Sequence, residues 1–383
     1  MCRNFDIEKS TLMLYFDHSA TTPIHPDVLN FMNSIQVDVY GNPSSVHKQG
    51  RRAKAIIEKA RNQVAQAIGA ESNQIIFTGG GSEANNQILW SILNWDKKHV
   101  IASTIEHPAV TKVLEQLKSL EIDSDLASVD QSGQVSMKNI QALIRNDTAL
   151  ITVMLANNEM GTIQPIRKIV QLAHEKNILV HTDAVQCLGK MPVNVKELGV
   201  DFLSLSAHKF YGPKGIGIIF AKDKKTISPL IIGGGQESNL RAGTENIVSI
   251  AGMGLAAEIA EKHLTEFISK LKTLENQFMQ GLKSFFSSAV YNGNSENKLP
   301  GLVSVSFPGY RSDILLAKLD RANIAVSSGS ACGAGDVKPS SVLYAMGLDD
   351  ETNISTLRFS FGSSNSSNQV AQLLTELKTI LKG

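Results

Sequence analysis

Between residues 74 and 221, short apolar runs alternate with amphipathic segments, and this alternation constrains the fold more than any other feature of the chain. The apolar runs are typical of strands and occupy residues 74–78, 99–103, 149–155, 178–183, 202–206 and 215–221. Segments with helical periodicity lie between several of them, at residues 82–93, 108–120, 137–144 and 166–176. This alternation predicts an α/β fold, in which a mostly parallel sheet has helices on both faces.

A second unit follows two long helical patterns at residues 247–264 and 266–286. Its strand patterns lie at residues 302–307, 323–327 and 355–361, and its helix patterns at 313–319, 340–346 and 368–381. This mixture favours a smaller α+β layer. We therefore predict an N-terminal arm over residues 1–14 that packs with the small unit, a large domain over 15–262 and a small domain over 263–383.

Charge and composition argue against several classes of protein. The 383 residues include 37 Lys or Arg and 36 Asp or Glu, and this balance argues against a nucleic-acid surface along the chain. The longest apolar stretch, residues 247–260, is too short to span a bilayer, and residues 1–10 lack the apolar core of a signal peptide. Three widely spaced cysteines suit a reducing compartment. We expect a cytoplasmic protein that binds neither membranes nor nucleic acid directly.

Polar clusters end five of the predicted strands. Ligands of open α/β sheets bind outside the carboxyl ends of the strands, so these clusters are the candidate site. They are Thr78–Ser82, Glu106–His107, Asn157–Glu159, Asp183–Gln186 and Ser206–Lys209.

Three glycines join the strand that ends at Thr78 to a helix that Ser82 opens. Bare amide N–H groups and the positive end of a helix form an anion site there. The spacing matches neither the dinucleotide fingerprint nor the Walker loop, which favours a phosphate without indicating a nucleotide. A tight turn with Ser82 as the helix N-cap explains the same residues equally well.

Asp183 and Lys209 each stand at the end of an apolar strand, where an unpaired charge is unfavourable. A heteroaromatic ring with a protonated nitrogen and an adjacent oxygen would satisfy both Asp183 and Gln186, while a helix cap is the simpler alternative for Asp183.

Desolvation would lower the pKa of the Lys209 amine and make it nucleophilic, as Schiff-base chemistry requires. Ser206 and His208 flank it as hydrogen-bond donors for a phosphate, and a snorkelling lysine is the alternative.

His107 precedes a proline at the start of a predicted helix. An imidazole at the edge of the sheet can stack on a flat cofactor ring or move protons, and a helix-capping role is equally consistent with the sequence. The chain contains no H-x-x-x-H or C-x-x-C spacing, so we predict no metal site.

Cys332 lies in a stretch of small residues, 327–335, that lacks periodicity and predicts a mobile, exposed loop. A thiol on such a loop is suited to nucleophilic attack and sulfur exchange, and an incidental surface cysteine is the alternative. Cys2 and Cys187 fit that incidental class better, because one is terminal and the other lies in an apolar, helix-like setting.

Arg358, between apolar residues on a strand of the second unit, is typical of a bidentate clamp for a carboxylate, or of a surface ion pair. Asn158 and Asn42 are polar turn residues, and turn formation alone explains either of them.

A set of motifs keeps its order from residue 15 to 362. The motifs are Asp17–Pro23, Gly41–Ser45 with His47, Glu106–His107, Asn157–Gly161, His181–Gln186, Ser206–Gly215, Arg241–Thr244, Ser327–Cys332 and Leu357–Ser360. Together they resemble the pyridoxal-phosphate enzymes of fold type I, within the class-V aminotransferase group, and are most similar to the cysteine desulfurases of the NifS/IscS type. Ser82 stands where that family usually has Thr, a change that keeps the hydroxyl. The resemblance implies a seven-stranded, mostly parallel sheet between helices plus a smaller α+β C-terminal domain.

The resemblance implies pyridoxal 5′-phosphate as the cofactor. Lys209 would join it covalently, Asp183 would pair with the pyridine nitrogen and Gln186 with the phenolic oxygen, while His107 would stack on the ring and help to move protons. Thr244 would reach the phosphate from the neighbouring subunit of a homodimer. The other residues implied to hold the phosphate are Gly81, Ser82, Ser206 and His208.

The implied reaction removes sulfur from L-cysteine, releases L-alanine and leaves a persulfide on Cys332. Arg358, Asn158 and Asn42 would bind the substrate carboxylate, and Asn158 would also lie against the cofactor. The sulfur would pass to an acceptor protein, either an iron–sulfur scaffold or a tRNA-thiolation enzyme.

Three other functions remain open on the sequence. A related enzyme acting on another amino acid, such as an aminotransferase or a selenocysteine lyase, has the same fold, but an aminotransferase has no need of Cys332. A catalytically idle paralogue acting as a scaffold is disfavoured because every expected catalytic residue is present. A nucleotide-binding α/β protein is disfavoured by the spacing of the glycines.

Overall fold

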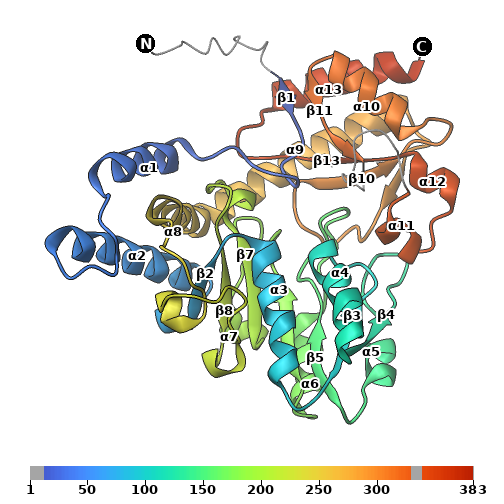
Figure 1. Ribbon diagram of the computed structural model, residues 1–383. Helices are drawn as coiled ribbons and strands as arrows, with labels where there is room; N and C mark the ends of the chain where they lie inside the picture. Colours follow the sequence, from blue (N-terminus) through green and yellow to red (C-terminus); the bar gives the residue numbers. More distant parts are fainter. Residues whose placement is uncertain (1–12, 329–338, 383) are drawn as a thin grey trace.

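The computed structural model describes residues 13–328 and 339–382, and Figure 1 shows a large α/β unit with a smaller unit against one end of its sheet. In spatial order, the strands of the large sheet are β2 (Ile75–Thr78), β8 (Gly217–Ala221), β7 (Phe202–Ser206), β6 (Leu179–Asp183), β5 (Thr148–Thr152), β3 (His99–Ser103) and β4 (Asp123–Ala127). Neighbouring strands from β7 to β4 are parallel, and β8 is antiparallel to both of its neighbours. The predicted seven-stranded, mostly parallel sheet is confirmed.

Successive strand residues face two separate hydrophobic cores, because side chains alternate across a sheet. In β2, Ile75 and Phe77 join one core and Ile76 joins the other, so the strand is apolar on both faces. The helices over one face are α3 (Gly81–Ser91) and α4 (Pro108–Leu117). The helices over the other face include α2 (Lys48–Ala67), α5 (Met137–Leu143), α6 (Ile166–His174) and α8 (Ile247–Lys262). Burial of each such isoleucine contributes about 1.5–3 kcal/mol.

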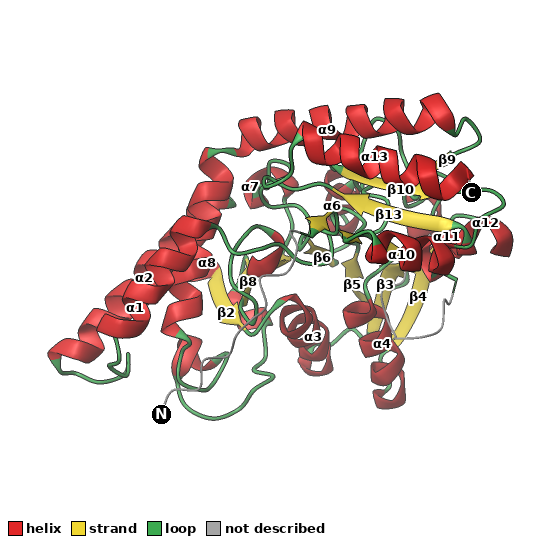
Figure 2. Ribbon diagram, turned by 90° about the horizontal axis from the view of Figure 1, so that it is seen from above, coloured by secondary structure: helices red, strands yellow, loops and turns green. Residues whose placement is uncertain are grey.

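The small unit has its own antiparallel sheet and its own core. Its strands are, in spatial order, β12 (Ser327–Ser328), β13 (Thr356–Ser360), β10 (Leu302–Ser306) and β9 (Val290–Asn292). Its helices are α9 (Leu264–Phe285), α10 (Ser312–Arg321), α11 (Ser341–Ala345), α12 (Asp350–Ile354) and α13 (Ser367–Lys382). Figure 2 shows α9 and α13 side by side along this sheet. The rings of Phe278 and Phe359, 4.6 Å apart between centroids, pack α9 onto β13.

The N-terminal segment contacts both units. Strand β1 (Leu14–Tyr15) pairs in parallel with β11 (Ile324–Ala325) of the small unit. After β1, the chain continues into helix α1 (Pro26–Asp38) of the large unit. The large unit also contains the short helix α7 (Val195–Leu198). The expected domain bounds stay a prediction, and most of the expected arm lies outside the described residues.

The structure differs from the expected elements in two ways. Residues 323–327, expected as one strand, form β11 and β12, which pair with different strands, because local sequence does not specify the pairing partner. The elements that were not expected are helices α1, α2, α7 and α12 and strands β1, β4 and β9. Strand β4 lacks an apolar run because it is an edge strand, and its Asp123 is exposed to solvent.

None of the helices in the described ranges combines the length and apolar character needed to cross a membrane.

Candidate active site

The five polar clusters lie at the carboxyl ends of β2, β3, β5, β6 and β7, which run in the same direction and therefore meet at one edge of the sheet. Arg358 of β13 reaches this edge from the small unit, where its Nη1 donates a hydrogen bond of 3.0 Å to the carbonyl oxygen of Asn158. The candidate site therefore lies between the two units.

Lys209 ends a short 3-10 turn, Ala207–Lys209, that directly follows β7. Its Nζ donates to two backbone carbonyl oxygens of the N-terminal segment, those of Ser19 and, at 2.7 Å, Ala20. Burial, together with the positive charges of Lys190 and Arg358, lowers the pKa of the Lys209 amine to about 7. The amine is thus partly unprotonated near neutral pH, as a nucleophile or proton acceptor must be.

Asp183 is the last residue of β6 and is buried. Its Oδ2 accepts a hydrogen bond of 2.6 Å from Nδ2 of Asn85 on α3, and its Oδ1 accepts one of 3.0 Å from the Val185 amide. Asn85 therefore holds the carboxylate in place. The contact with the Val185 amide closes a turn, and no helix follows Asp183 among the described residues before Val195, so the helix cap expected as the simpler alternative is wrong. The Asn85 contact comes from another element.

The glycine turn after β2 lets neighbouring side chains approach the backbone at the start of α3 closely. Helix α3 begins at Gly81 with Gly80 as its N-cap, so the interpretation of Ser82 as the cap is wrong. Gly80 has φ of 151°, a conformation that favours glycine, and a Cβ built on Gly81 would lie 2.7 Å from Cγ2 of Val185. The first amide groups of α3 have no acceptor within the helix, and the hydroxyl of Ser82 is on an exposed residue. This turn can hold a phosphate.

His107 caps α4, because its Nδ1 accepts a hydrogen bond of 3.0 Å from the Ala109 amide. The capping role expected as an alternative is therefore confirmed. The bond places the proton of the neutral ring on Nε2. Partial burial lowers the pKa of His107, Asp183 raises it and Lys209 lowers it, so the ring lies within the field of both residues. One residue can thus serve as a cap while its ring stays available to a ligand.

Ser206, Gln186 and His208 surround the same region. Ser206 is buried at the end of β7, and His208 accepts or donates a hydrogen bond of 3.1 Å between its Nδ1 and the hydroxyl of Thr21. Burial, with the charge of Lys209 beside it, lowers the pKa of His208 to about 4, which keeps its ring neutral. Gln186 is buried and bonds to Ser19 and Lys190 through its two amide atoms.

Arg358 is buried and makes an ion pair of 2.9 Å through Nη2 with Oδ1 of Asp17. The alternative of a surface ion pair is wrong in one respect, since the pair is internal. Among the described residues its Nε has no partner, although a guanidinium carries five N–H donors. The unused donors can bind a carboxylate.

Several expected residues are not brought to this edge by contacts within the chain. Asn42 is exposed, and its Oδ1 accepts a bond of 2.9 Å from the Ser44 amide in its own turn. Thr244 is exposed, three residues after Arg241, which pairs with Glu83 of α3 at 2.9 Å. Cys332 lies outside the described residues. Cys187 is a buried free thiol, as its assignment to the incidental class requires.

The sequence interpretation missed three residues at the site: Asn85, Asp17 as the partner of Arg358, and Lys190. Asn85 lies four residues after Gly81, so helical spacing placed it near the glycine turn and was a usable signal. Lys190 gave no such signal, because it is a single charge in an irregular stretch. Within the described ranges, no group of three or more His, Cys, Asp or Glu residues is arranged to hold a metal ion.

The arrangement fits pyridoxal phosphate. The turn offers the first amide groups of α3 to the phosphate, and Val185 approaches Gly81 so closely that a Cβ there would lie 2.7 Å from its Cγ2. A buried carboxylate at Asp183 suits a protonated ring nitrogen, and the Lys209 amine suits an aldehyde.

Comparisons with known proteins agree with this fit. The chain matches the class-V aminotransferase family over residues 14–373. A relative from Dictyoglomus turgidum, named cysteine desulfurase IscS, is 41% identical over 372 residues, which cover 96% of this chain and 94% of the relative. A solved NifS-like protein has a TM-score of 0.91 at 36% identity, over 97% of this chain and 100% of that one. SspA, solved in complex with cysteine, has a TM-score of 0.81 at 35% identity, over 92% of this chain and 100% of that one.

Proposed function

The chain belongs to the class-V aminotransferase family and is a pyridoxal-phosphate-dependent cysteine desulfurase, and from that premise we propose how its residues divide the reaction. It takes the sulfur of L-cysteine, releases L-alanine and leaves a persulfide on Cys332. The observation that carries this proposal is the Lys209 amine, which is held at the end of β7 with a pKa of about 7 and within the field of Asp183.

Groups from several strand ends would hold the cofactor. Lys209 would anchor it covalently, Asp183 would keep its ring nitrogen protonated, and Gln186 would donate to its phenolic oxygen. His107 would stack on the ring. The residues proposed for the phosphate are Gly81, Ser82, Ser206, His208 and, from a second copy of the chain, Thr244. Bound pyridoxal phosphate supplies an electron sink for negative charge on the substrate carbon.

After the substrate amine has displaced Lys209 from the cofactor, the freed Lys209 amine would take the proton from the substrate Cα, because its pKa of about 7 leaves it partly unprotonated near neutral pH. His107 can pass a proton through Nε2, since its Nδ1 is occupied by the Ala109 amide. Arg358 binds the substrate carboxylate through its unused donors, with Asn158 beside it. Asn42 is proposed as a further ligand of the carboxylate, although contacts within one chain do not bring it to this edge. Asp17 and the Asn158 carbonyl fix the plane of the guanidinium for this task.

Cys332 is the proposed nucleophile. Its thiolate attacks the sulfur of the substrate, so that a sulfur–sulfur bond forms while the carbon–sulfur bond breaks. The electron pair of the broken bond stays with the carbon, which takes up a proton and leaves as L-alanine. The persulfide then passes its outer sulfur to an acceptor protein, an iron–sulfur scaffold or a tRNA-thiolation enzyme.

We propose a homodimer as the working form. Large apolar side chains are exposed at Val37, Tyr40 and Ile232, as expected of surfaces that a second copy covers. Pro43 and Gln236 line one cavity, which puts the turn after α1 next to the segment before Thr244. Light scattering on the purified protein tests this state. The cytoplasmic location stays a prediction from the cysteine content.

The test incubates the protein with pyridoxal phosphate, L-cysteine and a thiol reductant, and quantifies alanine and sulfide. We expect equal amounts of both from the wild type. Cys332→Ala should keep the visible absorbance of the bound cofactor and lose sulfide release, whereas Cys187→Ala, which removes a buried thiol, should keep both. Undiminished sulfide release by Cys332→Ala would reject the persulfide mechanism.

A further inference from the structure

Lys190 is a buried cation that the proposed reaction does not use. It follows β6 by seven residues and is only 8% exposed. Among the described residues its one hydrogen-bond partner is the neutral Gln186 side chain, whose Oε1 accepts from Nζ at 3.1 Å. A buried ammonium group without an opposite charge is unfavourable, so its presence here calls for a physical reason.

The Lys190 ammonium settles the orientation of the Gln186 amide. Lysine is only a donor, and the Ser19 carbonyl, 2.9 Å from Nε2 of Gln186, is only an acceptor. With these two neighbours the amide oxygen must face Lys190 and the amide nitrogen must face Ser19. The second N–H of Nε2 has no partner among the described residues and is left for an acceptor in the site.

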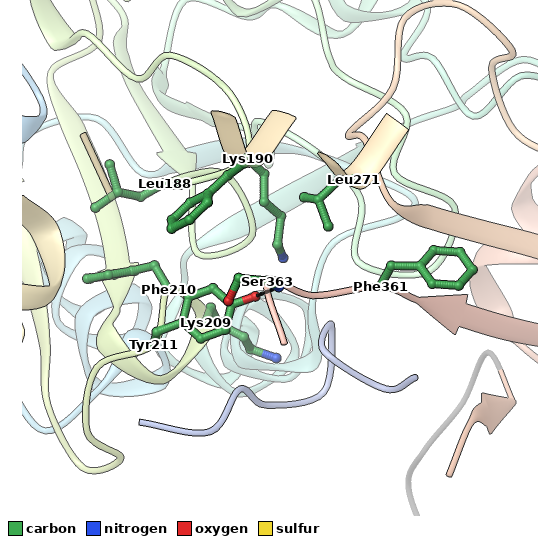
Figure 3. Close-up of a pocket in the computed structure, with 10 residues that line it drawn as sticks. Leu188, Lys190, Lys209, Phe210, Tyr211, Leu271, Phe361 and Ser363 are labelled. Atoms are coloured by element: carbon green, nitrogen blue, oxygen red, sulfur yellow. Dashed lines mark hydrogen bonds between the residues drawn. The ribbon is translucent and has the colours of Figure 1, made fainter. Parts of the chain in front are cut away.

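The two lysines are linked through one backbone group. The Ser19 carbonyl oxygen that accepts from Gln186 also accepts from Nζ of Lys209. Both lysines line a cavity of about 10 Å³ between the two units, with walls formed by Leu188, Phe210 and other apolar side chains (Figure 3). That volume has room for about one water molecule, so little solvent screens one ammonium from the other.

The charges around this pair do not balance it. Arg358 adds a third cation, already paired with Asp17. Burial is the main cause that lowers the pKa of Lys190 to about 8, a net value to which Cys187 contributes an increase and the Arg358 charge a decrease. After burial, Lys190 is the largest cause of the low pKa of Lys209. The other charged or titratable groups around the two lysines are Asp17, Asp183, His18, His107, His208 and Tyr211.

We propose that Lys190 is a positioning residue, whose ammonium fixes the Gln186 amide with its nitrogen available to the cofactor and places a second buried positive charge beside the Lys209 amine. This inference rests on the proposed function, because it gives Gln186 and Lys209 their roles toward pyridoxal phosphate. It assigns Lys190 no contact with the substrate or the cofactor.

The first readout is the rate at which cofactor-free protein combines with added pyridoxal phosphate, measured across pH 6–10 by visible absorbance. Because the Lys209 amine must be unprotonated to react, the midpoint of this profile reports its pKa. We expect Lys190→Met to raise the midpoint by about one pH unit, as loss of a neighbouring like charge does. Lys222→Met, which removes an exposed lysine, should leave it unchanged.

The second readout is the absorbance maximum of the bound cofactor, which responds to a donor on its phenolic oxygen. Lys190→Met should displace the maximum as Gln186→Ala does, and the double variant should show no further displacement. Lys190→Gln keeps an amide donor but no charge, so it should raise the pH midpoint and leave the maximum near that of the wild type. Circular dichroism verifies that each variant is folded.

Unchanged midpoints in folded Lys190→Met and Lys190→Gln would overturn the inference while leaving the proposed function intact. A wild type that neither combines with pyridoxal phosphate nor forms alanine would instead overturn the proposed function itself. If both Lys190 variants fail to fold, nitrogen-15 NMR of the lysine amines in the cofactor-free wild type decides the matter. Two amines that titrate below pH 9 are then expected, and only one would overturn the proposal.

Discussion

The molecule buries positive charge in two regions and surrounds it differently in each. Arg61 on α2 donates to both carboxylate oxygens of Glu237, at 2.8 and 2.7 Å, and its guanidinium carbon lies 4.8 Å from the centre of the Phe77 ring. Glu237 also accepts from the Phe77 amide at 2.8 Å. Lys190 and Lys209, by contrast, donate only to neutral oxygens among the described residues.

The consequence is visible in the acidity of the groups. Burial lowers the pKa of Arg61, but the hydrogen bonds and charges of Glu237 and, to a smaller extent, Glu58 together raise it by more, so the net change is upward. The two lysines have no such counter-ion bond, and their pKa values fall to about 8 and about 7. A buried cation with a matched anion keeps its charge, whereas a buried lysine without one loses its proton more readily and becomes a reactive amine.

The largest expected effect is that of Lys209→Ala, in the region of the two buried lysines. We expect sulfide release from L-cysteine to fall about a thousandfold, because both the covalent anchor and the proposed base are lost. The fold should persist, since the Lys209 side chain bonds only to backbone carbonyls. Activity within tenfold of the wild type, with an unchanged circular dichroism spectrum, would contradict the role of this amine.

Glu237→Gln should make the surroundings of Arg61 more like those of Lys190 and Lys209, because it removes the carboxylate that is most closely bonded to the Arg61 guanidinium. Arg61 would then keep only the exposed carboxylate of Glu58, 3.2 Å from its Nε, and we expect the free energy of unfolding to fall by about 3 kcal/mol in urea titrations. The matched control is Asp147→Asn, which removes the charge of an exposed pair with Arg145 and should change stability by less than about 1 kcal/mol. Equal losses in the two variants would show that burial of the pair is irrelevant.

Arg358→Lys tests whether the third cation, which has a carboxylate partner, still serves the substrate. A lysine keeps the charge but loses the planar fork of donors. We expect KM for L-cysteine to rise about ten- to a hundredfold, with a smaller change in kcat and unaltered absorbance of the bound cofactor. An unchanged KM would mean that the guanidinium serves only Asp17 and Asn158.

The smallest expected effect is that of Lys190→Met on the pH dependence of the free energy of unfolding. The unfolded chain keeps the Lys190 proton up to the ordinary pKa of 10.5, but the folded chain keeps it only to about 8, so folding releases protons between these values. The penalty of burying the ammonium is therefore complete below about pH 8 and disappears towards pH 10.5. Relative to the wild type, Lys190→Met should lose about 1–2 kcal/mol of stability between pH 7 and pH 10.

Lys222→Met provides the baseline for this measurement, because its exposed amine should give a difference from the wild type that does not change with pH. A similarly flat difference for Lys190→Met would show that Lys190 keeps its ordinary acidity, and the contrast between the two buried regions would fail.

Much of the fold follows from local patterns in the sequence. The apolar runs that end at Thr78, Asp183 and Ser206 form strands of one sheet, and these polar ends gather at one edge because parallel strands share a direction. The same logic failed at β4, where an edge position removes the apolar run. It also failed at residues 323–327, where two partner strands divide one predicted strand.

The site was predicted in part for the same reason. Residues at strand ends, such as Lys209 and Asp183, have a place that the pattern specifies. The residues that hold them, such as Asn85 and Lys190, lie on a helix or in an irregular turn and carry no pattern of their own. The motif that contains Asp17 was evident, but its ion pair with Arg358 was not.

The sequence by itself determined which residue types stand at the ends of the strands, because hydrophobic periodicity and glycine placement act over a few residues. Only the tertiary structure decided which charges meet. Asp17 and Arg358 are 341 positions apart, and Asn85 and Asp183 are 98 apart. The acidity of a buried group depends on neighbours within a few ångströms in space, and the folded chain supplies those neighbours from distant parts of the sequence.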